Sequence, residues 1–544
     1  MEWDTERKAK QAKKKAADSV TTTKIVPPEK IVELMECVIR PKDIVALEGD
    51  NQKQAVFLAK SLTKVNPQKV HDLHMVMSCP QIKEHLDIFD LGIARELDFS
   101  FAGKNDKRIY QMIVDGKVKV GAIHTYLELY SRYFTDLTPN VALCVAELAD
   151  REGNLYTGNN TEDTPTIVEA AAFKSGIVLV QVNEIVDKLP RVDIPSDWVD
   201  YIVEADEPCT LEPLMTRDPA IIKDEHVMMA MIALKGIYAR HLVNRMNHGI
   251  GFASAAIELL LPTYGEELGL KGKICQYWAA NPIPAMIPAI ESGWVKRVHS
   301  FGSEVGMEDY VKARPDIFFT DSLHGGLRSN RCYCQMAGLY GIDMFSGSTL
   351  QMDALGNSST VTKGRISGFG GAPNMGNNPH GRRHSSYAWN SMITNRSDPL
   401  AKGRKLVTQM LRTTTSKGPS FVETLDAIEV GKSGGFAEAP IMIHGEDLTH
   451  LITEIGLSYV YMAESVEERK KLIAAVAGDT PIGKTITEKE IDDLRKAGKV
   501  AFVEDLGIDP AKATRDLLSA KNMDDIIKWS GGLYRVPPQL GGGD

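Results

Sequence analysis

The sequence contains no long hydrophobic run. The apolar stretch around Ile257–Leu261 ends after a handful of residues, whereas a membrane-spanning helix needs roughly 20 apolar residues. The N-terminus from Met1 to Asp4 lacks the basic and then apolar pattern of a secretory signal. We therefore predict a cytoplasmic protein with no membrane insertion.

Cysteine is scarce, and its spacing suggests no pairing. The seven cysteines are an odd number spread from Cys37 to Cys334, which does not form a disulfide framework. The only close pair, Cys332 and Cys334, has no second Cys/His cluster to complete a zinc site. We predict reduced thiols and no metal on this chain.

Positive charge is also in deficit. The chain has 63 Lys and Arg against 72 Asp and Glu, a net charge of −9, which argues against general affinity for nucleic acid. The catalytic signature His-Glu-x-x-His is missing, so nothing indicates a zinc protease of that type.

The chain is long enough for several domains, and its two halves contain the same motifs. At 544 residues and roughly 150 residues per domain, we expect two to four folded units. The motif Asp-x-x-Gly-Asn occurs at positions 150–154 and 353–357, and a glycine turn precedes a helix-period segment at Gly49 and at Gly249. The spacing of both pairs is close to 200 residues, which indicates duplication of one unit.

Within each half, short β-branched runs alternate with helix-period stretches. Strands are expected at 141–145, 177–182 and 317–320, and a helix at 225–243. Because the apolar runs do not follow a strict two-residue period, buried parallel strands covered by helices are favoured. We predict an α/β fold with two similar domains of mostly parallel sheets and a helical C-terminal tail.

The predicted boundaries follow composition. Residues 1–24 form a basic N-terminal arm, interpreted as solvated, with an acidic partner as the alternative. Domains are expected at 25–220 and 221–480, joined through the proline-rich linker Glu204–Asp224. A helical C-terminal extension, 481–544, begins with the capping box Thr487-Glu-Lys-Glu490 and continues at Asp509-Pro510; we expect it to serve packing or subunit contacts.

The most unusual segment is the glycine-rich stretch 367–384. Gly368, Gly370 and Gly371 allow backbone N–H groups to converge on an anion or an oxyanion, although a plain turn-rich loop is the alternative. The segment also gathers polar donors, which would suit a small dianion or a phosphorylated carrier: Asn374, Asn377, His380, Arg382, Arg383 and His384. Taken singly, each arginine could equally be a solvated charge.

Two further segments of the second half are candidates. The carboxylate in Ser303-Glu-Val-Gly306 could act as a nucleophile toward an activated acyl group, or be a surface charge. The turn Asn247-His-Gly-Ile-Gly251 could present a helix N-terminus to a carboxylate or thioester oxygen, or be only a tight strand-to-helix turn.

These segments together resemble a known family. Four ordered motifs are similar to the β-half signatures of family I coenzyme A transferases: Asn247-His-Gly-Ile-Gly251, Ser303-Glu-Val-Gly306, Ser348-Thr-Leu-Gln-Met-Asp-Ala-Leu-Gly-Asn357 and Gly368-Phe-Gly-Gly-Ala372. The α-half counterpart resembles Ala149-Asp-Arg-Glu-Gly-Asn154 followed by Val182-Asn-Glu-Ile-Val186. Over nearly the whole chain the sequence most resembles malonate decarboxylase α subunits, through Leu47-Glu-Gly-Asp-Asn-Gln-Lys-Gln54, Gly370-Gly-Ala-Pro-Asn-Met-Gly376, Gly381-Arg-Arg-His384 and Gly531-Gly-Leu-Tyr-Arg-Val-Pro-Pro538.

The resemblance implies an acyl-carrier-protein transferase that exchanges acetate for malonate on the carrier thiol. It implies malonate and acetate as small substrates, and an acyl carrier protein bearing a phosphoribosyl-dephospho-CoA prosthetic group. It also implies carboxyltransferase and decarboxylase subunits as further partners, with no cofactor on this chain. A coenzyme A transferase or citrate lyase α subunit acting on another acid is one alternative, and a non-catalytic carrier-docking scaffold is another.

The resemblance also implies site residues. Glu304 would attack the acyl thioester and later carry the thiol; alternatively, malonate itself attacks and Glu304 only positions it. Val305 stands where the family commonly has Asn, and the turn Glu48-Gly-Asp-Asn51 departs from the usual glycine-rich loop. We expect oxyanion donors at Gly249, Gly251, Gly370 and Gly371. The expected substrate-binding residues are Asn51, Gln54, Asn247, Asn374, Arg382, Arg383 and His384, of which Arg382, Arg383 or His384 would hold the distal carboxylate of malonate.

Overall fold

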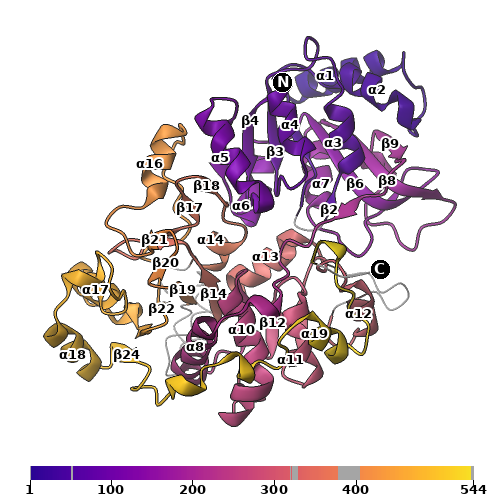
Figure 1. Ribbon diagram of the computed structural model, residues 1–544. Helices are drawn as coiled ribbons and strands as arrows, with labels where there is room; N and C mark the ends of the chain where they lie inside the picture. Colours follow the sequence, from indigo (N-terminus) through magenta and orange to yellow (C-terminus); the bar gives the residue numbers. More distant parts are fainter. Residues whose placement is uncertain (1, 51–52, 319, 321–328, 378–404, 541–544) are drawn as a thin grey trace, which may run out of the picture.

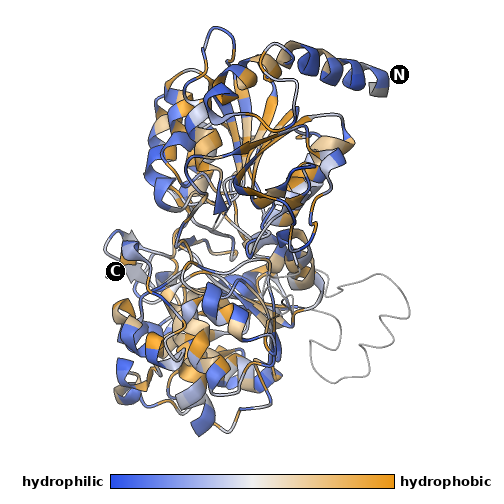
Figure 2. Ribbon diagram, turned by 90° about the vertical axis from the view of Figure 1, so that its right-hand side faces the viewer, coloured by the Kyte–Doolittle hydropathy of each residue, from blue (hydrophilic) through white to orange (hydrophobic). Residues whose placement is uncertain are grey.

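The protein forms two α/β domains, one above the other in Figure 1. The structure is a computed structural model, and it describes residues 2–50, 53–318, 320, 329–377 and 405–540. Each domain is built on an eight-stranded sheet. The strands are apolar in the interior of the first domain, whereas the outer helices carry the hydrophilic residues (Figure 2).

The first sheet has the strand order β5-β4-β3-β1-β6-β8-β9, and β7 pairs antiparallel with β6. All other pairs are parallel, because helical crossovers connect them. The strands are β1 (Ile44–Leu47), β3 (Leu73–Met77), β4 (Ala94–Phe99), β5 (Lys119–Ile123), β6 (Val141–Asp150), β7 (Leu155–Tyr156), β8 (Ile177–Val186) and β9 (Tyr201–Glu204). The helices are α2 (Ile31–Val38), α3 (Val56–Leu62), α4 (Glu84–Asp90), α5 (Asp106–Val114), α6 (Tyr126–Phe134) and α7 (Thr164–Phe173).

The second sheet has the order β13-β12-β11-β14-β19-β22-β23-β24, in which only β23 and β24 run antiparallel to their neighbours. Its strands are β11 (Arg245–His248), β12 (Tyr277–Ala279), β13 (Arg297–His299), β14 (Met344–Ser348), β19 (Leu406–Met410), β22 (His450–Ile452), β23 (Gly456–Ser458) and β24 (Val500–Phe502). The helices are α8 (Asp224–Ala233), α9 (Ala239–His241), α10 (Phe252–Leu260), α11 (Ile287–Glu291), α12 (Glu308–Ala313), α13 (Arg331–Tyr340), α14 (Ala372–Met375), α16 (Asp426–Ser433), α17 (Val466–Ala474), α18 (Glu488–Lys496) and α19 (Met523–Trp529).

Four small two-stranded sheets complete the fold. They pair β2 (Lys53–Gln54) with β10 (Thr210–Leu211), β15 (Gln351–Met352) with β16 (Ser358–Ser359), β17 (Val361–Thr362) with β18 (Arg365–Ile366), and β20 (Thr414–Thr415) with β21 (Gly418–Pro419).

The two large sheets share one topology. The order β4-β3-β1-β6-β8-β9 of the first domain matches β13-β12-β11-β14-β19-β22 of the second, strand for strand. The first-domain glycine turn follows β1, and its counterpart at Gly249 follows β11, the strand equivalent to β1. The predicted α/β fold of two similar domains is therefore confirmed.

The repeated Asp-x-x-Gly-Asn motif forms the same turn in both halves. Asp150 Oδ1 accepts the N–H groups of residues 152 and 154 at 3.0 and 2.9 Å, and Asp353 Oδ1 accepts those of residues 355 and 357 at 2.9 and 3.0 Å. Gly153 and Gly356 have φ of 93° and 89°, a region that side chains disfavour. Identical hydrogen bonds at equivalent sites support duplication of one ancestral unit.

Some local predictions need correction. Residues 317–320 were expected as a strand, but the described part of this segment has only isolated bridge residues, Phe318, which pairs with Val298, and Thr320. The basic segment, expected to be a solvated arm, forms α1 (Glu2–Ala17). Arg7, Lys8 and Lys15 are exposed, whereas Lys13 pairs with Asp43 at 2.7 Å and Lys10 with Asp200 at 2.7 Å. These carboxylates anchor α1 to the first domain.

The described part of the segment after residue 480 contains the helices α18 and α19 and short 3₁₀ turns. The Thr487 capping box precedes α18, and Asp509 accepts from Ala511 N–H at the start of a 3₁₀ turn. Between them, β24 extends the second sheet. Within the described residues, no helix combines the length and apolar character that crossing a membrane requires.

Candidate active site

A cavity of about 280 Å³ lies between the two domains. The first domain contributes Phe101 and Tyr126 to its wall, and the interdomain segment contributes Met215 and Arg217. The second domain contributes the turn 247–251, the start of α10 and the glycine-rich segment 367–372. The predicted glycine turns thus meet at one cavity.

The glycine-rich segment closes the cavity by docking onto the first domain. The N–H groups of Phe369 and Gly370 both donate to the carbonyl oxygen of Ser100, at 2.7 and 2.9 Å. Gly368 has φ of 79°, and a Cβ there would lie 2.5 Å from the same carbonyl oxygen. Glycine at position 368 therefore permits the close approach of the two domains.

The glycine amides differ in their availability. The N–H of Gly249 donates to Ser346 O at 2.7 Å, and that of Gly370 is taken by Ser100. Within the described residues, neither Gly251 nor Gly371 shows a hydrogen-bond acceptor for its N–H. The expected oxyanion donors are therefore narrowed to Gly251 and Gly371.

Glu304 lies directly behind the cavity wall. Its Oε1 accepts the N–H of Met215 at 3.1 Å, and its own N–H donates to Pro282 O at 3.0 Å. The residue is fully buried and is not itself a lining residue, although Met215, Arg217 and Phe301 are. Its assignment as the catalytic carboxylate stays a prediction.

The structure brings together only part of the predicted binding set. Asn247 lines the cavity and donates to Ala279 O at 2.5 Å. Asn374 instead lies buried between Thr125 and Gln335, and Gln54 donates to Asp50 O at 2.6 Å inside the first domain. The remaining predicted residues lie outside the described ones: Asn51, Arg382, Arg383 and His384.

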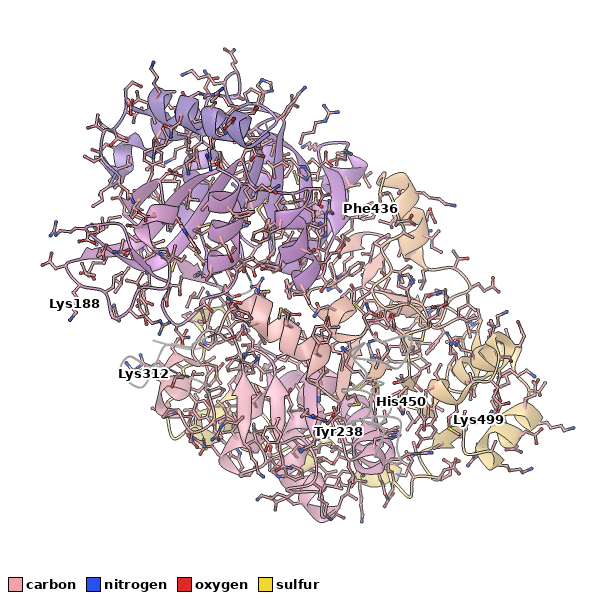
Figure 3. The ribbon with its side chains drawn as sticks, turned by 180° about the vertical axis from the view of Figure 1, so that it is seen from behind. Lys188, Tyr238, Lys312, Phe436, His450 and Lys499 are labelled. Carbon is pink, nitrogen blue, oxygen red and sulfur yellow. The ribbon has the colours of Figure 1, made fainter. Side chains whose placement is uncertain are left out.

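Sequence reasoning missed a chain of three hydrogen-bonding side chains at the cavity wall. His248 Nδ1 lies 2.9 Å from Glu258 Oε1, and His248 Nε2 lies 2.5 Å from the Tyr238 hydroxyl. Tyr238 is labelled in the second domain in Figure 3. Glu258 is buried inside the apolar helix α10, and a lone glutamate in an apolar helical run was the available signal, since buried charges are normally paired.

Sequence reasoning also missed a buried ionic cluster that joins the two domains. Arg331, at the start of α13, lies 2.8 Å from Asp163 and 3.6 Å from Asp50, and it pairs with Glu162. Its guanidinium lies over the Tyr126 ring at 4.5 Å and the Phe301 ring at 5.1 Å. Tyr126 belongs to the first domain and Phe301 to the second, and both rings line the cavity. Arg331 therefore packs against cavity-wall residues of both domains.

The cluster holds more carboxyl groups than cations. Glu48 pairs with Lys53 at 3.3 Å, so the charged members are Glu48, Asp50, Glu162 and Asp163 against Lys53 and Arg331. Burial raises the pKa of Asp50 and of Asp163 to about 7 and that of Glu162 to about 8, with Arg331 opposing the shift. The cluster therefore retains protons near neutral pH.

We expect the contribution of this cluster to thermal stability to fall as pH rises from about 4 to about 8. A carboxyl group whose pKa is higher in the folded than in the unfolded chain binds more protons when folded, so the folded state loses stability between the two pKa values. Because the folded pKa values are about 7 for Asp50 and Asp163 and about 8 for Glu162, this loss of stability is complete near pH 8. Scanning calorimetry of wild type and Glu162→Gln tests it: the variant should show the smaller decline, and an equal decline in both proteins would contradict the assignment.

One group of side chains could hold a metal, and it lies outside the cavity. Within the described residues, His74, Glu96 and Asp98 place ligand atoms within 4.8 Å of one another on β3 and β4. Asp98 already bridges His74 and His124 at 2.5 Å each, and Glu96 pairs with Lys119 at 3.0 Å. We interpret the group as an ion-pair network of the first sheet.

The C-terminal segment packs against the turn that carries Glu304. Arg535 N–H donates to Gly306 O at 3.0 Å, and Tyr534 is buried. Gly306 has φ of 86°, and a Cβ there would collide with the carbonyl oxygen of Arg535. The tail thus fixes the Ser303–Gly306 turn.

Gly306→Ala is therefore expected to lower stability by about 2 kcal/mol or more and to loosen the C-terminal tail. Gly293→Ala is the matched control, since Gly293 has a similar φ of 79° but its Cβ position would meet only Lys271 Cε, at 3.9 Å; it should cost roughly 1 kcal/mol. Denaturant unfolding and limited proteolysis measure both effects. Equal losses in the two variants would mean that the tail contact contributes nothing.

Comparison with known proteins identifies the family of the chain. Residues 2–541 match the family model "Malonate decarboxylase, alpha subunit, transporter". The chain is 52% identical, over 99% of its length and 98% of the relative's, to a Malonomonas rubra protein named acetyl-S-ACP:malonate ACP transferase.

Two solved structures extend the comparison. A Pseudomonas malonate decarboxylase hetero-tetramer in complex with malonate contains a chain that is 56% identical, with a TM-score of 0.94 and 99% of both chains covered. A Streptococcus mutans structure with citrate, assigned to the alpha subunit of citrate lyase, shares the fold at 16% identity, with a TM-score of 0.59 and 85% and 87% of the two chains covered. This chain belongs to the malonate decarboxylase alpha subunit family.

Proposed function

We propose that this chain is an acyl-carrier-protein transferase that converts acetyl-S-carrier and malonate into malonyl-S-carrier and acetate. The observation that carries the proposal is the interdomain cavity, whose wall includes Gly251 and Gly371 as amide donors and, directly behind it, the Glu304 carboxylate. The 52% identical relative bears the name of this activity.

The proposed chemistry exchanges bonds without redox change. The Glu304 carboxylate attacks the acetyl thioester, so a C–O bond forms, the C–S bond breaks and the thiolate leaves. The thiolate then attacks the Glu304 carbonyl of the anhydride and releases acetate. Malonate attacks the resulting glutamyl thioester, so a C–O bond forms, the C–S bond breaks and the thiolate leaves again. The thiolate then attacks the malonyl carbonyl of this second anhydride, which forms the malonyl thioester and breaks the C–O bond to the Glu304 carboxylate. Each attack builds charge on a carbonyl oxygen, which is where preorganised amides stabilise the transition state most.

The cavity suits the end of a thiol arm better than a whole nucleotide. Its volume of about 280 Å³ is at the small end of ligand pockets. Apolar side chains such as Trp278, Ile283 and Met286 line it together with the amide of Asn247, which matches an acyl group on an alkyl amide chain. We propose that the rest of the phosphoribosyl-dephospho-CoA group stays with the partner carrier protein, and that carboxyltransferase and decarboxylase subunits complete the assembly.

Thioester exchange by the purified chain tests the function. Acetyl-coenzyme A serves as the acyl donor, with malonate, citrate or butyrate as the acid, and mass spectrometry identifies the new thioester. We expect malonyl thioester and acetate. Formation of a different thioester would indicate another transferase, and carrier binding without exchange would indicate a docking scaffold.

A further inference from the structure

Malonate differs from acetate by one carboxylate, so a site that favours malonate needs a cation to receive that group. The described residues of the cavity wall include three basic side chains, Arg217, His248 and Arg365. His248 is paired with Glu258 at 2.9 Å, and Arg365 with Asp106 at 2.5 Å. Two of the three basic side chains therefore already lie against protein carboxylates.

Arg217 is the basic side chain of the three that has no carboxylate partner within the described residues. Its Nη1 donates to the backbone carbonyls of Leu214 and Thr216, at 3.2 and 2.9 Å, which fixes the direction of the side chain. Its guanidinium forms no ion pair within 4.0 Å in the described part of the chain. Burial lowers the pKa of Arg217, with the charge of Glu304 opposing the shift. A half-buried cation of this kind gains from an anionic ligand.

The N-terminus of α10 lies beside this guanidinium. Arg217 Cζ is 5.9 Å from the ring of Phe252, the first residue of the helix. No side chain caps this end, and a helix N-terminus with open amides favours an anion. Ser254, in the first turn, lines the cavity, and its buried Oγ has no hydrogen-bond partner. The helix end and Ser254 thus provide donors that a bound carboxylate would satisfy.

We infer that Arg217 and the first turn of α10, including Ser254, form a carboxylate subsite that takes the distal carboxylate of malonate and selects it over acetate. The inference rests on the proposed transfer function. It names a positively charged group inside the described structure, in addition to the predicted Arg382, Arg383 and His384, which lie outside it.

The selectivity of Arg217→Gln tests the subsite. Two rates are compared in the full chain: malonyl transfer from acetyl-coenzyme A, and exchange of labelled acetate into acetyl-coenzyme A, which needs no distal carboxylate. We expect the ratio of kcat/KM for malonate to that for acetate to fall about 100-fold, as for a lost charge-assisted hydrogen bond. Acetate exchange should stay within about threefold of wild type. Arg217→Lys should keep part of the ratio, because the charge remains but the planar fork is lost.

Arg240→Gln is the matched control, because Arg240 also lies over a ring, that of Tyr459 at 4.1 Å, without lining the cavity. An unchanged ratio in an active Arg217 variant would overturn the subsite and leave the function intact. Loss of acetate exchange in both Arg217 variants would also overturn it, since Arg217 would then serve the whole site. Wild type that makes no malonyl thioester would overturn the proposed function itself.

Discussion

Glu304→Ala is expected to lower malonyl transfer by about 10⁴-fold, the scale on which enzymes lose rate when a group that acts in every chemical step is removed. In the proposed route the Glu304 carboxylate forms and breaks an acyl bond in each half of the exchange. Glu304→Gln should lose nearly as much, because the neutral amide keeps the shape of the side chain but not its nucleophilic oxygen. Single-turnover transfer from acetyl-coenzyme A to malonate measures both variants.

Glu308→Gln provides the control for charge and folding. Glu308 begins α12, four residues after Glu304, and does not line the cavity. The Glu308→Gln variant should transfer malonyl groups at close to the wild-type rate. Near-normal turnover by Glu304→Ala would remove Glu304 from the mechanism.

Arg331→Met is expected to reduce the free energy of unfolding by about 3 to 5 kcal/mol, the usual loss when one partner of a buried ion pair is removed. The substitution leaves Asp50, Glu162 and Asp163 without their shared cation in the interior. It also removes the group that lies over Tyr126 and Phe301. Thermal unfolding should show a midpoint lower by roughly 10 °C.

Arg314→Met is the matched comparison. Arg314 also pairs with two carboxylates, Glu291 and Asp316, but all three side chains are partly exposed. Exposed pairs contribute about 0 to 1 kcal/mol, so its loss should be small. Similar losses for Arg331→Met and Arg314→Met would show that burial of the Arg331 cluster does not matter.

The duplicated architecture could be predicted because it depends on local patterns. The Asp-x-x-Gly-Asn turns at 150–154 and 353–357 are each held by hydrogen bonds within five residues. Buried parallel strands such as β6 and β8 appear as apolar runs in the sequence. Such features need no knowledge of distant contacts.

The composition of the site could be predicted only in part. The glycine turns were recognisable, but which amides stay available depends on long-range partners, as Gly370 and Ser100 show. Arg331 meets Glu162 and Asp163 across a separation of more than 160 residues, which no local pattern reveals. Arg217 lies in a proline-rich stretch typical of a linker, and only the folded structure places it at the cavity wall.

Photolabelling of the cavity tests most directly the claim that acyl exchange occurs between the two domains. A pantetheine thioester with a diazirine on its acyl group would be irradiated with the full chain, and the labelled peptides mapped by mass spectrometry. We predict labels from both domains, near residues 101 and 126 and within 247–255, with labelling reduced by malonate. Labels on one domain only, away from these residues, or labelling that malonate leaves unchanged, would contradict the account.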